Sequence, residues 1–158
     1  MNGVFESVLE EILKVQSVLP EQILFLQPYS SFAMSKLRDD PPSIASPMRL
    51  FISTTTDLAN VHYQAEIVCW EDKRIMPDAR KDIINPLIAA LQPGDKGLYN
   101  AAKSGTGESV NLLHIRWLQK LDTSFTVAQL EKVRDGEPLS TARTQGGEWS
   151  YVKLEAPS

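Results

Sequence analysis

The stretch VHYQAEIVCW, residues 61–70, alternates apolar and polar side chains along most of its length. The apolar phase consists of Val61, Tyr63, Ala65, Ile67 and Cys69. Alternation with a period of two is typical of a β-strand that turns one face toward a core. The segment RLFIS at residues 49–53 has the composition of a second strand, and the turn-forming TTTD follows it. We therefore predict a β-hairpin built from residues 48–54 and 61–71.

Two more segments have the short apolar runs of strands, residues 22–27 and 110–118. Turn-forming residues separate them from the hairpin, so all four strands are expected in one curved sheet.

Three segments have helical patterns. Residues 3–16 repeat apolar side chains at helical spacing, with Glu and Lys on the other faces. Residues 78–91 begin at Asp78, a favourable N-cap, but Pro86 requires a kink or a later start. Residues 126–135 open with TVAQ, which has the form of a capping box. The predicted fold class is therefore α+β.

The chain has 158 residues, of which 42% are hydrophobic and 23% charged. This length and composition indicate one globular domain over residues 1–158. The net charge of -4 argues against tight, sequence-independent binding to duplex nucleic acid. We see no leader and no apolar run long enough for a membrane span, so the expected location is cytoplasmic.

Cys69 is the only cysteine, which excludes an intrachain disulfide and a four-thiolate zinc site. It is expected to be a small buried hydrophobe, inert to thiol reagents. His62 and His114 have no ligand spacing between them, so no metal site and no cofactor are predicted. Trp117 is expected in the core because tryptophan is mostly buried.

The order of elements in residues 22–72 resembles the ASCH branch of the PUA-like superfamily, which also includes EVE and YTH domains. ILFLQP at residues 23–28 looks like the first strand of that branch, and RLFISTT at residues 49–55 is similar to the second. Lys36 and Glu66 could take the lysine and acidic positions of its motifs. The resemblance implies a small curved β-barrel, or a strongly bent mixed sheet with flanking helices, over residues 22–154 after an N-terminal helix in residues 1–20.

Some members of that family bind RNA, so the resemblance favours a nucleic-acid-binding module that takes a single base, modified or unmodified, into an aromatic pocket. The side chains expected to stack on the base are Tyr29, Trp70 and Trp149. Those expected to hydrogen-bond its edges are Gln27, Ser53 and Thr54. Those expected to contact phosphates are Lys36, Lys73 and Arg143.

Two alternatives stay open. Other members of the family are small amidohydrolases that act on acetylated cytidine, which would make Lys36 and Glu66 catalytic. The chain could instead be a regulatory or protein-interaction subunit without chemistry of its own, whose apolar helix at residues 3–16 docks a protein partner. No catalytic motif in the sequence is specific enough to decide whether the chain is an enzyme.

Overall fold

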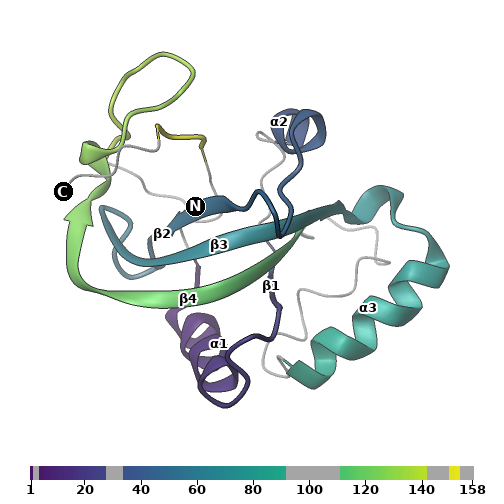
Figure 1. Ribbon diagram of the computed structural model, residues 1–158. Helices are drawn as coiled ribbons and strands as arrows, with labels where there is room; N and C mark the ends of the chain where they lie inside the picture. Colours follow the sequence, from purple (N-terminus) through teal and green to yellow (C-terminus); the bar gives the residue numbers. More distant parts are fainter. Residues whose placement is uncertain (2–3, 28–33, 92–110, 142–149, 154–158) are drawn as a thin grey trace.

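The computed structural model describes residue 1 and residues 4–27, 34–91, 111–141 and 150–153. Four strands form one antiparallel sheet in the order β1-β4-β3-β2 (Figure 1). The strands are β1 (Leu24–Leu26), β2 (Met48–Ile52), β3 (Asn60–Asp72) and β4 (Asn111–Thr126). The helices are α1 (Glu6–Val18), α2 (Met34–Asp39) and α3 (Asp78–Leu91), with the short 3-10 helices η1 (Lys73–Ile75) and η3 (Val127–Gln129). The α+β class is confirmed.

The predicted hairpin is present. β2 and β3 pair antiparallel, with Leu50 opposite Ala65. All four predicted strands belong to the same sheet, but β4 continues to Thr126, well beyond the expected end at residue 118. Its second half is mostly exposed and polar, so it lacks the period-two apolar pattern that predicts a strand. Backbone hydrogen bonds to β3 form this part of the strand instead.

The sheet is antiparallel rather than mixed, and its edge strands β1 and β2 do not pair with each other in the described residues. The closed barrel is therefore not confirmed. The sheet is nonetheless bent, because β3 and β4 curve together along their length (Figure 1). Their register shifts at three places, and such bulges bend a strand pair and increase its twist.

One bulge changes the face on which Cys69 lies. Ile67 pairs with Ile115, whereas Cys69 pairs with His114, the residue adjacent to Ile115 in β4. Val68 is therefore the extra residue in β3. Successive residues of a strand point to opposite faces, and Cys69 therefore leaves the core face that Ile67 occupies. The prediction that these two residues share one face is wrong, and the thiol is only partly buried.

A second register shift lies beside Trp117, which has a φ of 55° and is 47% exposed. Bulky residues rarely adopt this left-handed conformation. The Gln16 side chain of α1 stabilises it: Nε2 donates to the Leu118 carbonyl at 2.8 Å, and the Leu118 amide donates to Oε1 at 2.7 Å. The expectation that Trp117 belongs to the core is wrong, because the bulge turns the ring outward, where the Arg116 guanidinium lies 4.0 Å from its centroid.

The helices α1 and α3 confirm two of the three helix predictions. α1 buries Leu9 and Ile12 against the central core of the sheet. α3 buries Ile84 and Ile88 in a second core with Phe25 and Leu112.

The start of α3 differs by one position from the prediction. The Pro77 carbonyl accepts hydrogen bonds from the backbone amides of Arg80 and Lys81, so Asp78 lies in the first turn rather than at the N-cap. The helix continues through Pro86 without a later start, because the residues that it buries lie on both sides of the proline.

The helix predicted over residues 126–135 is wrong. Thr126 does cap a helical start, since its hydroxyl accepts from the Ala128 amide at 3.3 Å, but the helix is the single turn η3. The chain then extends, and Glu131 bridges to Pro138. Gly136, at a φ of 74°, closes the turn between them, a conformation for which glycine is suited.

Candidate functional site

A cavity of about 260 Å³ lies beside the edge strand β2. Its walls come from β2 and its flanks, from η3 and the chain after it, and from residues 150–152. Its lining includes Asp40, Arg49, Phe51, Ser53, Leu139 and Tyr151. Pockets with mostly apolar walls and a few polar groups are the usual form of small-ligand sites.

The apolar wall of this pocket is a separate hydrophobic cluster. Phe51, Val61, Leu130 and Leu139 are buried there together with Val127. The Phe51 ring meets the edge of the Phe125 ring at a centroid distance of 5.6 Å. The cluster joins β2, β3 and the chain after η3, so the pocket wall is held by residues far apart in the sequence.

The polar wall includes Tyr151, whose ring has the Lys36 ammonium 5.0 Å from its centroid. Burial raises the pKa of Tyr151 to about 12, and the nearby Asp40 carboxylate acts in the same direction. The phenol is therefore neutral at physiological pH and keeps its hydrogen for donation. The exposed side chains of Asp40 and Arg49 add one charge of each sign to the lining.

Some of the residues that the sequence predicts for a base site lie at this pocket, and others lie elsewhere or outside the described residues. Ser53 lines the pocket, and Lys36 on α2 reaches it through Tyr151. Thr54 is buried next to Ser53, where its hydroxyl lies 3.2 Å from that of Thr56. The proposed residues Tyr29, Arg143 and Trp149 lie outside the described residues.

Gln27, Trp70 and Lys73 do not line this pocket. Trp70 is partly buried against the core and donates from Nε1 to Asn111 Oδ1 at 2.7 Å. Lys73 is only 5% exposed, in η1. Gln27, directly after β1, is 6% exposed, and its amide nitrogen and oxygen have no hydrogen-bond partner among the described residues.

The two residues of the amidohydrolase alternative are not brought into contact in the described part of the chain. Glu66 accepts from Arg116 Nε at 3.2 Å, whereas Lys36 lies over Tyr151.

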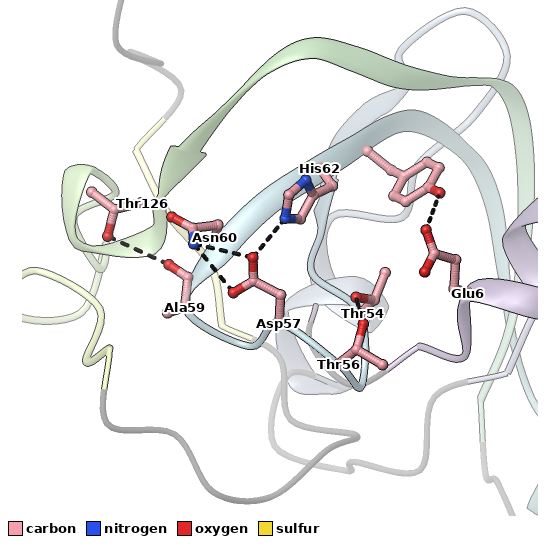
Figure 2. Close-up of polar contacts among 9 residues, drawn as sticks. Glu6, Thr54, Thr56, Asp57, Ala59, Asn60, His62 and Thr126 are labelled. Carbon is pink, nitrogen blue, oxygen red and sulfur yellow. Dashed lines mark hydrogen bonds and ion pairs between the residues drawn. The ribbon is translucent and has the colours of Figure 1, made fainter.

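The end of the β2–β3 hairpin holds a compact set of polar contacts (Figure 2). The Asp57 carboxylate lies 2.7 Å from His62 Nε2 and accepts from Asn60 Nδ2 at 3.1 and 3.2 Å. Hydrogen bonds from His62 and Asn60 hold the pKa of Asp57 below its usual value. Each of these groups is used within the hairpin, so the arrangement stabilises the turn.

A second polar cluster, which no pattern in the sequence predicts, lies on the sheet face next to α3. Glu71 accepts from Arg80 through both oxygens, at 2.8 and 3.1 Å, and its Oε2 lies 2.7 Å from His114 Nε2. Cys69 completes the set: one ligand-type atom from each of Cys69, Glu71 and His114 lies within 4.8 Å of the others. No local pattern marks this cluster, because strand register alone brings β3 and β4 residues together.

Burial and hydrogen bonds together set the pKa values of this cluster. Burial raises the pKa of Glu71, but the hydrogen bonds from Arg80 and His114 outweigh it and leave that pKa below its usual value. Burial lowers the pKa of His114, against the pull of Glu71. It raises the pKa of Cys69, and the charge of Glu71 adds to the effect.

Comparison of the chain with models of protein families, with curated proteins and with solved structures finds no match. Within the part of the chain that the structure describes, every helix is too short or too polar to cross a bilayer.

Proposed function

We propose that this protein is a binding module that takes a single planar base of a nucleic acid into the pocket beside β2. The observation that carries the proposal is the pocket itself. Its volume of about 260 Å³ lies just below the ~300–1,000 Å³ typical of ligand sites, so it suits one small ring system. The resemblance to PUA-like domains, some of which bind RNA, supports the same reading.

Phe51 and Tyr151 supply the aromatic surfaces in this proposal. Stacking of a base on an aromatic ring contributes about 1–3 kcal/mol and tolerates any base, because every base has a π-face. Tyr151 and Ser53 offer hydroxyl groups for the base edges. The carboxylate of Asp40 favours bases with an exocyclic amino group, since such carboxylates accept from the amino group of cytosine.

Phosphate contacts would come from Lys36 and Arg49, which lie at the pocket or next to it. A net charge of -4 makes a long electrostatic footprint on duplex DNA unfavourable. Binding should therefore depend more on stacking than on charge, and single-stranded or unpaired bases are the expected targets.

The test is a titration of single-stranded oligonucleotides, including methylated and hydroxymethylated cytosines, monitored by fluorescence anisotropy at low salt. Tyr151→Leu should weaken binding by about 1–3 kcal/mol. Lys36→Gln should weaken it less and should lower the salt slope by about one unit. Trp117→Leu is the matched control, because Trp117 is exposed but does not line the pocket. The proposal fails if no oligonucleotide binds, or if Trp117→Leu abolishes binding while Tyr151→Leu does not.

A further inference from the structure

The cluster beside α3 gathers three ligand types from two adjacent strands. Cys69 and Glu71 come from β3 and His114 from β4, and Cys69 stands directly opposite His114 in the register. The bulge at Val68 turns Cys69 to the face where His114 lies. Without that extra residue, the thiol would be on the core face with Ile67.

We propose that Cys69, Glu71 and His114 form a binding site for a zinc ion. Thiolate, imidazole and carboxylate are the three side-chain ligands that zinc takes in proteins. The combination of one soft sulfur ligand with nitrogen and oxygen disfavours the hard cations Mg²⁺ and Ca²⁺. Three protein ligands leave the fourth tetrahedral position for water or a small ligand.

The distances require small side-chain movements. In a tetrahedral zinc site the ligand atoms are about 3.3–3.6 Å apart, given Zn–N and Zn–O near 2.0–2.1 Å and Zn–S near 2.3 Å. The separation of His114 Nε2 and Glu71 Oε2, 2.7 Å, would widen slightly, and Cys69 Sγ, now within 4.8 Å of both, would move inward.

The ion would take the place of the hydrogen between His114 and Glu71. A carboxylate has about four lone-pair positions, and the hydrogen bonds of Glu71 described above use two for Arg80 and one for His114. The bonds from Arg80 can therefore persist and keep the carboxylate oriented. The imidazole of His114 is already neutral at pH 7, so its hydrogen would move from Nε2 to Nδ1 and stay on the ring. Binding would release only the thiol hydrogen of Cys69 as a proton, and the thiolate and the Glu71 carboxylate would balance the charge of the ion.

The same cluster is poorly arranged for thiol nucleophilic chemistry. The hydrogen bond found for Cys69 in the described residues goes to its neighbour's carbonyl, the oxygen of Trp70, at 3.9 Å. A catalytic thiol needs a base within hydrogen-bond reach.

The His114 and Glu71 side chains are 13% and 22% exposed, so the cluster is accessible to an ion from solvent.

Cobalt(II) titration of the reduced, chelator-treated full chain tests the site, because thiolate ligation produces a cobalt–sulfur charge-transfer band in the near ultraviolet. We expect saturation at one ion per chain and displacement of cobalt by zinc. Cys69→Ser should abolish the band, and Glu71→Gln and His114→Ala should weaken binding about tenfold or more. His62→Ala is the matched control, since His62 is bonded to Asp57 at the hairpin, and it should titrate like the wild type.

A second measurement needs no variant. Zinc should slow the alkylation of Cys69 in the wild-type protein, and a chelator should restore the original rate. The site is ruled out if the charge-transfer band is absent, if Cys69→Ser binds cobalt as tightly as the wild type, or if zinc leaves the alkylation rate unchanged.

Discussion

The two polar clusters of this molecule are built in different ways. At the hairpin end, Asp57 takes its hydrogen bonds from Asn60 and His62, at most five positions away. Beside α3, Glu71 joins Arg80, nine positions away, to His114, 43 positions away. The first cluster stabilises a turn that local chemistry already favours. The second exists only when β3, β4 and α3 are assembled, and it leaves a thiol adjacent to an imidazole and a carboxylate.

The largest effect should come from removing the centre of the long-range cluster. Glu71→Ala leaves the Arg80 and His114 groups without the carboxylate that binds them, and hydrogen bonds to charged groups contribute about 1.5–3 kcal/mol. We expect the free energy of unfolding in urea to fall by about 2–3 kcal/mol. Glu71→Gln, which keeps an acceptor oxygen, should lose less. Equal losses in both variants would mean that the negative charge, which both variants lack, holds the cluster, and that the acceptor oxygen of glutamine contributes nothing.

A second long-range contact, between Gln16 and the backbone of Leu118, should give the next largest effect. Gln16→Leu removes the amide that pairs with both backbone groups of Leu118. A buried backbone donor or acceptor that loses its partner costs about 1–3 kcal/mol, so we expect a destabilisation of that size by urea unfolding. Gln22→Leu is a suitable control, because the hydrogen bond that its amide donates within the described residues goes to the neighbouring Ile23 carbonyl. A loss below about 0.5 kcal/mol would show that water replaces the Gln16 amide at the bulge.

The contribution of the hairpin cluster to the free energy of unfolding should depend on pH. The pKa of Asp57 in the folded state lies below its ordinary value of 3.8. Its contribution to stability is therefore present above pH 3.8 and is lost as the pH falls through the folded-state pKa. Asp57→Asn should be less stable than the wild type near neutral pH, and the gap should shrink in acid. Urea unfolding at several pH values measures this, and a gap independent of pH would contradict it.

The smallest effect concerns Cys69. Burial and the charge of Glu71 raise the pKa of the thiol, and only the thiolate reacts. Labelling of the native protein by a thiol reagent at neutral pH should be slower than labelling of the urea-unfolded chain, and its rate should rise with pH. Native labelling as fast as in the unfolded chain would show that the local structure opens freely.

Much of the fold follows from local patterns. The alternation in residues 61–70 predicts β3, and the pairing with β2 follows from the turn residues between them. The helical spacing in residues 3–16 and 78–91 predicts α1 and α3. These predictions succeed because a buried face imposes its period on the sequence.

The failures have a common cause. The helix expected over residues 126–135 gives way to an extended segment because Leu130 and Leu139 bury their side chains against Phe51 and Val61. The capping signal at Thr126 is used, but only for one turn. Tertiary contacts thus override a local preference that is worth little on its own.

The candidate sites could be predicted from the sequence less well than the fold. The sequence predicts Ser53 and Lys36 as candidates; Ser53 lines the pocket beside β2, and Lys36 lies over Tyr151 in its wall. It does not predict Tyr151 or Phe51, because nothing local shows that residues 150–152 pass beside β2.

What the sequence determines by itself is the α+β class, the hairpin, the common sheet and two of the helices, since each depends on the period of neighbouring side chains. What only the tertiary structure decides is the register between β3 and β4. A shift of one residue in a strand exchanges its faces, and the extra residue Val68 moves Cys69 from the side of Ile67 to the side of His114. The alternation within β3 cannot reveal such an insertion, because the register is set by pairing with the neighbouring strand β4.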